Sequence, residues 1–157
     1  MHTIEIFLEY HWAVERPELN FNLNDKKLTG STEIIKKFNF QENIVHKFKI
    51  TNFKEQNSLE IQLINKTDEL INAQSDHWVS IKNINVDQVA ADWLLFEHTV
   101  FKHQMSDQWV SNMKKQGIDI APEYRPGTEM RLNGIFTFEF DNPFLVQRII
   151  KDWQKNI

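Results

Sequence analysis

The chain of 157 residues has the length of one domain, and at this size it can bury about 70% of the surface that it exposes when unfolded. Its 41% hydrophobic and 12% aromatic residues exclude a disordered chain, and the lack of cysteine excludes disulfide scaffolds, thiolate zinc sites and cysteine nucleophiles. The net charge of −4 argues against generic nucleic-acid binding, and no apolar run is long enough for a signal sequence or a membrane span. We therefore expect a single soluble domain over residues 1–157, made in the cytosol, that binds neither nucleic acid nor membrane.

The first third of the chain alternates apolar and polar residues, a period typical of half-buried strands. We predict strands over residues 4–10, 19–23, 31–40 and 43–53. In the first of them Ile4, Ile6 and Leu8 share the buried face, and in the last His46 shares a face with buried residues as a hydrogen-bonded core or boundary residue.

Two further strands enclose a polar stretch in the middle of the chain. Residues 58–63 alternate regularly, residues 65–76 are polar, and residues 78–86 alternate again. Within the last segment Val79 and Ile81 share one phase, whereas Ile84 and Val86 share the other. One extra residue near Asn83 would reconcile the two phases, which indicates a β-bulge.

Residues 87–103 fit both helical and strand spacing, and among so many strands we favour a turn to Asp92 followed by a strand over 93–103. Ser106 and Asp107 then precede a short helix near 106–116, with Gly117 at its end. Residues 118–127 hold two of the four prolines and predict a long loop.

The end of the chain carries the strongest strand pattern, over residues 129–140, followed by a helix near 143–155. Asn142 is the expected N-cap and Pro143 the first helical residue. The helix has one apolar stripe, which we expect to dock on the sheets, and which contains Val146, Ile149, Ile150 and Trp153. The whole pattern predicts a mainly all-β fold, an antiparallel β-sandwich of jelly-roll type with these two helices.

Motifs of catalysis are missing from the sequence: it has no Gly-x-Ser-x-Gly, no His-Glu-x-x-His and no glycine-rich phosphate loop. The six histidines are scattered, and no spacing among them is typical of a metal site. We therefore expect a protein that is not an enzyme and that needs no cofactor.

Calcium is the one cation that the sequence leaves open. Asp68, Glu69 and Asp76 lie in or beside the polar stretch, and loop carboxylates of this kind bind hard cations in some β-sandwich modules. The alternative is that these side chains only solvate a loop that connects two strands.

Aromatic residues offer a candidate ligand-binding set. Trp109 and Tyr124 lie in the least regular segment, near Arg125 and His103, and exposed rings with polar neighbours can stack on sugar faces. Trp12, directly after the first strand, is a further candidate. The favoured alternative for Trp109 is that it anchors the short helix to the sheet, and the other tryptophans, Trp78, Trp93 and Trp153, are expected in the core.

Several short motifs resemble those of small β-sandwich proteins encoded by tailed phages. These proteins often have a strand that ends in Asn-Lys-Thr-Asp, here residues 65–68, and a closing Asn-Gly-aromatic strand followed by Pro-aromatic, here residues 133–136 and 143–144. The likeness covers about residues 58–153. It differs after residue 68, where the acidic, glycine-containing hairpin of the phage proteins is replaced by "ELINAQSDH".

The resemblance implies a fold similar to carbohydrate-binding modules and a place in the virion, after synthesis in the host cytoplasm. It gives two functional hypotheses. The first is a structural or assembly protein of the head or tail surface, which binds other virion proteins or copies of itself. The second is a carbohydrate-binding module that recognises a cell-surface glycan, with or without calcium.

Overall fold

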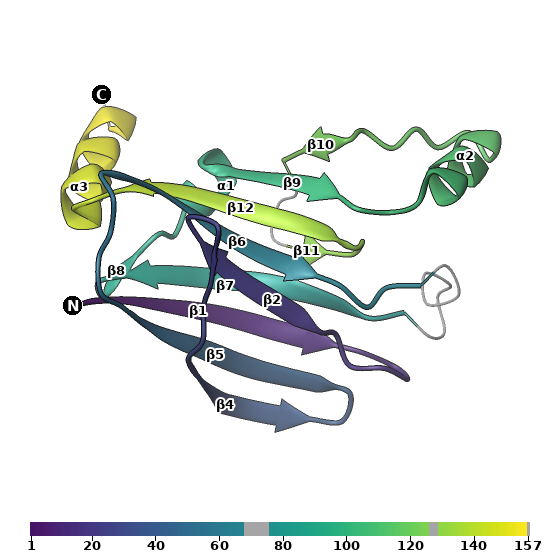
Figure 1. Ribbon diagram of the computed structural model, residues 1–157, viewed down its shortest axis with the longest axis horizontal. Coiled ribbons are helices and arrows are strands. Elements are labelled where there is room, and N and C mark those ends of the chain that lie inside the picture. Colours follow the sequence, from purple (N-terminus) through teal and green to yellow (C-terminus); the bar gives the residue numbers. More distant parts are fainter. Residues whose placement is uncertain (68–75, 126–128, 157) are drawn as a thin grey trace.

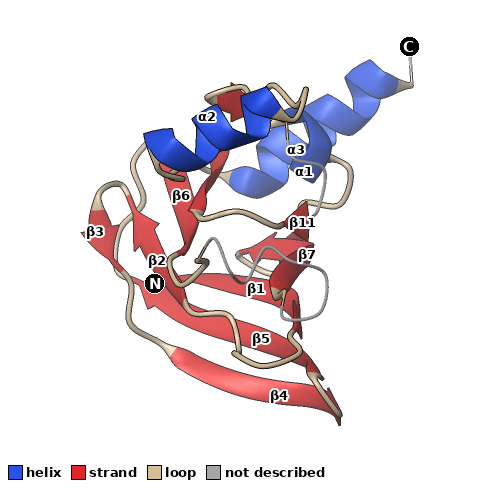
Figure 2. Ribbon diagram, turned by 90° about the vertical axis from the view of Figure 1, so that its right-hand side faces the viewer, coloured by secondary structure: helices blue, strands red, loops and turns tan. Residues whose placement is uncertain are grey.

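The computed structural model describes residues 1–67, 76–125 and 129–156, and these form two antiparallel sheets packed face to face (Figure 1). Figure 2 shows the two layers from the side, with the three labelled helices on the side of the second sheet. The prediction of an all-β antiparallel sandwich is therefore confirmed.

Sheet A has the strand order β11-β7-β1-β5-β4, with β8 added beside β7. Its strands are β1 (His2–His11), β4 (Ser31–Phe38), β5 (Gln41–Ile50), β7 (Trp78–Val86), β8 (Val89–Ala90) and β11 (Glu129–Met130). Along β1, Phe7 lies opposite Asn83 of β7, whereas the next residue, Leu8, lies opposite Ile81. Lys82 is the extra residue, so the β-bulge predicted near Asn83 is confirmed.

Sheet B has the strand order β10-β9-β12-β6-β2-β3. Its strands are β2 (Leu19–Leu23), β3 (Lys26–Lys27), β6 (Gln56–Leu63), β9 (Thr99–His103), β10 (Glu123–Tyr124) and β12 (Gly134–Asp141). The turn between β2 and β3 places Asn24 at φ 50° and Asp25 at φ 66°, the left-handed region that Asn and Asp tolerate better than most residues.

The helices are α1 (Leu94–Glu97), α2 (Asp107–Lys115) and α3 (Phe144–Lys155). The two predicted helices are confirmed, and Ser106 caps α2 by accepting a hydrogen bond from the backbone N–H of Trp109 at 3.1 Å. Three local predictions are wrong. Pro143 is the N-cap of α3 and not its first helical residue, and α1 replaces the first part of the strand expected over 93–103. The strand expected over 129–140 is split into β11 of sheet A and β12 of sheet B.

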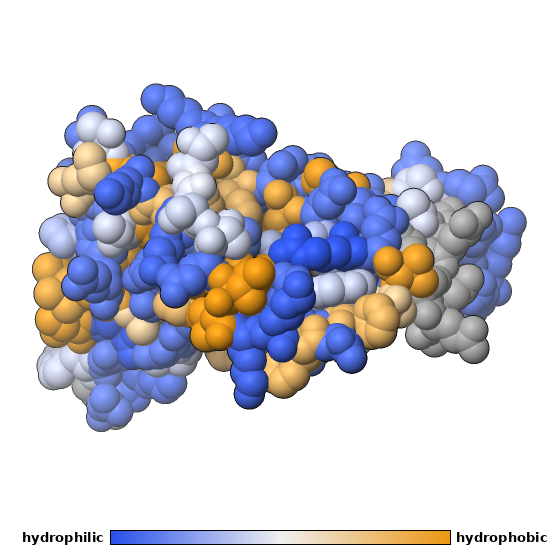
Figure 3. Space-filling model, turned by 90° about the horizontal axis from the view of Figure 1, so that it is seen from below, coloured by the Kyte–Doolittle hydropathy of each residue, from blue (hydrophilic) through white to orange (hydrophobic). Residues whose placement is uncertain are grey.

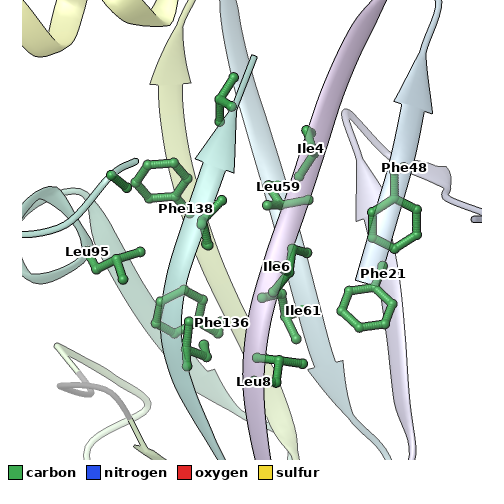
Figure 4. Packing of buried hydrophobic residues seen from close by; sticks show 14 of the residues in the cluster. Ile4, Ile6, Leu8, Phe21, Phe48, Leu59, Ile61, Leu95, Phe136 and Phe138 are labelled. Atoms are coloured by element: carbon green, nitrogen blue, oxygen red, sulfur yellow. The ribbon is translucent and has the colours of Figure 1, made fainter. Parts of the chain in front are cut away.

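The core fills the space between the two sheets. Figure 4 shows Ile4, Ile6 and Leu8 of β1 side by side with Leu59 and Ile61 of β6, while Phe136 and Phe138 of β12 extend the same layer. These residues point inward because alternate side chains of a strand lie on one face, and full burial of each contributes roughly 1.5–3 kcal/mol. The core thus leaves the outer faces, the edges and α3 as possible binding surfaces.

Candidate protein-interaction surfaces

Helix α3 is attached to the sandwich through its polar side. Arg148 donates hydrogen bonds to the backbone carbonyl of Ala90 and, over 3.2 Å, to the carboxylate of Asp92. Asp152 accepts a hydrogen bond of 2.8 Å from the indole N–H of Trp93, and it also accepts one of 3.1 Å from Arg148.

Further contacts add to the attachment of α3. The ammonium of Lys155 lies 4.3 Å from the centre of the Trp93 ring, and Phe144 at the start of the helix is buried against Phe138 and Phe140. Apart from Phe144 and from Gln147, whose side chain accepts a hydrogen bond of 2.8 Å from the backbone N–H of Asp141 in β12, the α3 residues that hold the helix are therefore charged.

The apolar side of α3 faces away from the sandwich. Ile149 is 59% exposed and Trp153 68% exposed, and each of the other members of the stripe is about half exposed. The apolar face consists of Leu145, Val146, Ile149, Ile150 and Trp153. Two expectations from the sequence are therefore wrong: the stripe does not dock on the sheets, and Trp153 is not in the core.

Strand β4 is the second exposed apolar element. It forms the end of sheet A, pairs with β5 along one edge, and pairs with no described strand along the other. All eight of its residues are exposed. The apolar side chains exposed on β4 and the following turn are those of Ile34, Ile35, Phe38 and Phe40. Figure 3 shows the molecule from below, the side on which β4 lies in Figure 1, with hydrophobic residues among hydrophilic ones.

The predicted sugar-binding residues do not form one set in the structure. Trp109 is 6% exposed, so its ring faces are covered and the residue anchors α2, as the favoured alternative proposed. Trp12 directly follows β1 of sheet A and packs against the core, whereas Tyr124 belongs to β10 of sheet B. His103, at the end of β9, accepts a hydrogen bond from the backbone N–H of Met105 at 3.2 Å.

Tyr124 and Arg125 are the two predicted residues that remain accessible together. Tyr124 is 38% exposed, and its ring centre lies 5.4 Å from that of Phe101. Arg125 lines a groove of about 200 Å³ together with His98 and Glu139.

A larger polar groove, of about 520 Å³, shares His98 and Glu139 with this one and was not identified from the sequence. Its walls come from the turn after β2, from β6 and β12, and from α3. Its polar lining includes Asn24, Asp25, Gln56, Ser58, Asp141 and Lys151. Amide, hydroxyl and carboxylate groups of this kind can hydrogen-bond a polar ligand. No sequence signal could have identified it, because its residues come from segments that are far apart in the chain.

Of the predicted calcium ligands, Asp68 and Glu69 lie outside the described residues. Asp76 forms an ion pair with Lys66, whose side chain is fully buried, and lies 3.9 Å from Arg131. Burial lowers the pKa of Lys66, although its hydrogen bond with Asp76 opposes this change. To bind a cation, Asp76 would have to give up a cationic partner that it already has. Elsewhere in the described chain no three acidic or histidine side chains are grouped to hold a metal ion.

His77, next to Asp76, is also buried. Its Nδ1 donates a hydrogen bond of 2.8 Å to the backbone carbonyl of Glu15, while its Nε2 is buried without a hydrogen-bond partner. Burial lowers the pKa of His77, so the ring is held neutral.

Among the helices of the described chain, none combines the length and the apolar character that crossing a membrane requires. Comparison of the chain with protein-family models, with curated proteins and with solved structures finds no match.

Proposed function

We propose that the protein is a non-enzymatic structural or assembly component of a phage virion, at the surface of the head or tail, and that it acts through protein–protein contacts. The observation that carries this proposal is the outward apolar face of α3. The phage setting is supported by the resemblance of residues 58–153 alone.

An exposed face of this kind is costly for an isolated chain. Soluble monomers seldom expose a contiguous apolar patch above a few hundred Å², and larger patches are typical of interaction sites. The five side chains of the α3 face are each about half exposed or more. Together they form an apolar patch on the order of 500 Å². Covering it with another protein removes this area from water.

The spacing of the α3 face fits one known mode of recognition. Leu145, Ile149 and Trp153 follow one another at intervals of four residues, with Val146 and Ile150 beside them. Side chains at such spacing serve as anchors when an amphipathic helix binds in an apolar groove of a partner. Because the charged residues Arg148 and Asp152 are bound to the sandwich, they are not available to solvate this face.

The test is co-sedimentation with virus particles from cells that naturally make the protein. We expect the wild-type chain in the particle fraction, and we expect Ile149→Asp combined with Trp153→Asp to remove it. Gln154→Asp is the matched control, since it adds a charge to the same helix outside the apolar face. A wild-type chain that never sediments with particles, or a double variant that sediments like the control, would overturn the proposal.

A carbohydrate-binding module is the second candidate function. It is supported by the exposed ring of Tyr124, beside Arg125 and the two connected polar grooves. The test is a glycan array with and without calcium, in which Tyr124→Ala should abolish any signal and Trp109→Phe, which keeps the buried anchor apolar, should retain it. An empty array under both conditions would remove this candidate.

A further inference from the structure

The open edge of β4 has the chemistry of a strand-pairing site. One side of the strand is hydrogen-bonded to β5, and its other side presents backbone N–H and C=O groups that no described strand pairs. Only another extended strand can satisfy such a row of groups in register. In an isolated chain water solvates this edge, and the protein occupant that fits it is a β-strand.

A β-bulge in β4 places two opposite charges on the same face of the sheet. Ile34 lies opposite Ile44 of β5, and Lys36 lies opposite the next residue back, Asn43, so that Ile35 is the extra residue. Three residues apart in a regular strand, Glu33 and Lys36 would point to opposite faces.

The register of β4 with β5 shows that Glu33 and Lys36 instead point to the same face of the sheet. Glu33 lies opposite Val45, whereas Lys36 lies opposite Asn43. Val45 and Asn43 are two residues apart on β5 and therefore share the outer face of sheet A. Glu33 and Lys36 lie on that face with them.

We infer that β4 pairs antiparallel with β4 of a second copy around a two-fold axis between Ile34 and Ile35. In this register Glu33 of each copy lies opposite Lys36 of the other, on the outer face of the joined sheet. The same register places Thr32 opposite Lys37 and Ser31 opposite Phe38, and each pair shares a face because both strands carry the bulge. The two sheets A become one continuous sheet.

Alternative registers lack this match. A shift of the axis onto Ile35 would place Glu33 opposite Lys37, which points to the other face because it lies opposite Glu42 of β5. Moving the axis to lie between Ile35 and Lys36 would place Lys36 opposite Ile35 and bring the two copies of Lys36 together at the axis. Opposite charges directly across a strand pair stabilise it, and like charges destabilise it.

Lysines and bulges in edge strands commonly prevent pairing with other chains. In β4 these features instead favour pairing with a second copy, because both strands then carry the bulge and each Lys36 lies opposite a Glu33 of the other copy. The hydrogen bond of 2.7 Å from Lys47 lowers the pKa of Glu33 and keeps its carboxylate ionised. The self-pairing deepens the proposed assembly role, on which it rests, but it uses none of the residues of the α3 face.

The experiment is the molar mass of the purified chain by light scattering over a range of concentrations. We expect a dimer, and we expect Glu33→Lys and Lys36→Glu each to weaken dimerisation by at least about tenfold, because each places like charges together twice. The double variant Glu33→Lys with Lys36→Glu restores opposite charges across the axis and should restore the dimer. Lys27→Glu, in the end strand β3 of sheet B, is the matched control and should leave the dimer unchanged.

A wild-type monomer at every concentration would overturn the inference and would show that Lys36, Lys37 and the bulge protect the edge. A dimer that persists in both single variants, or that the double variant fails to restore, would also overturn it. The particle assay of the α3 variants is a separate measurement, so a chain that does not dimerise through β4 can still have the proposed assembly role. Circular dichroism of each variant verifies that it is folded.

Discussion

At the scale of single residues, burial decides the charge of His46. Its Nε2 accepts a hydrogen bond of 2.8 Å from the hydroxyl of Tyr10, and its Nδ1 lies 3.2 Å from Thr32 Oγ1. Burial, with a smaller contribution from Arg16, lowers the pKa of His46 to about 4. Burial also raises the pKa of Tyr10, so the phenol keeps its proton and remains the donor. The sequence predicted the hydrogen-bonded boundary position of His46 but not these partners.

Acid should therefore destabilise the fold through His46. The unfolded chain binds a proton at this residue near pH 6.5 and the folded chain only near pH 4, so the free energy of unfolding falls as the pH decreases through this window. We expect His46→Gln to reduce this slope in urea unfolding measured between pH 7 and pH 4. His98→Gln, at the rim of the polar groove, is the control for the loss of one histidine. An unchanged slope in His46→Gln would contradict the expectation.

Lys66, unlike His46, is a residue whose burial could not be predicted from the sequence. Its ammonium forms an ion pair with Asp76 and donates a hydrogen bond of 2.6 Å to the backbone carbonyl of His77. Its backbone N–H and C=O are both hydrogen-bonded to the side chain of Asn133. The polar composition of residues 65–76 indicates a solvated connection, but the start of that segment is held inside the molecule.

Lys66→Met should lower the free energy of unfolding by about 2 kcal/mol, because it leaves Asp76 and the carbonyl of His77 without their partner. Lys82→Met is the matched control: its ammonium lies 3.1 Å from Glu9 but is more than half exposed, so the cost should stay below about 1 kcal/mol. Urea unfolding at neutral pH measures both. Equal losses in the two variants would show that the buried pair has no special role.

At the scale of elements, α3 inverts the usual arrangement of an amphipathic helix. Its hydrophobic periodicity is strong enough to predict the helix and its bounds almost to the residue. The periodicity does not state which face meets the sandwich. Trp93 and Asp92 present an indole N–H and a carboxylate where α3 docks, so Arg148 and Asp152 bind there and the apolar face is left outside.

The inversion predicts an unusual order of stabilities. Ile149→Gln and Trp153→Gln should each change the free energy of unfolding by less than about 1 kcal/mol, as exposed positions do. Arg148→Gln should cost about 2 kcal/mol, because it removes hydrogen bonds to Ala90, Asp92 and Asp152. Thermal and urea unfolding of the three variants test this order. A large loss in Ile149→Gln would show that its face is buried in the folded monomer.

At the scale of the whole molecule, the two apolar surfaces lie on opposite sides. In Figures 1 and 2, α3 lies above the sandwich and β4 at its lower end. They differ in chemistry as well, since the α3 face is apolar whereas the β4 pairing includes two pairs of opposite charges. A dimer joined at β4 would present two α3 faces to further partners.

Salt should therefore act differently on the two contacts. Raising the ionic strength shortens the Debye length from about 10 Å at 0.1 M to about 3 Å at 1 M and screens exposed charge pairs. We expect the β4 dimer to weaken over this range in light scattering, while attachment of the chain to particles through α3 is retained in sedimentation. If high salt removed both contacts, or removed only the attachment to particles through α3, the expectation would be contradicted.

Most of the longer strands, the two longer helices, the bulge in β7 and the sandwich were predictable from the sequence, because strand period, helix period and capping residues are local properties. The short strands β8 and β10 were not predicted, and β11 and β12 were predicted as one strand. Helix α1 was missed because Phe96 and Val100 satisfy both the helical and the strand period. The tertiary structure alone decided which surfaces remain uncovered. The exposed face of α3 depends on groups from β8 and the turn after it, and the matched charges of β4 depend on a bulge set by its pairing with β5. The polar groove likewise exists only because distant segments of the chain meet. Contacts of this kind join residues far apart in the chain, and no local pattern encodes them.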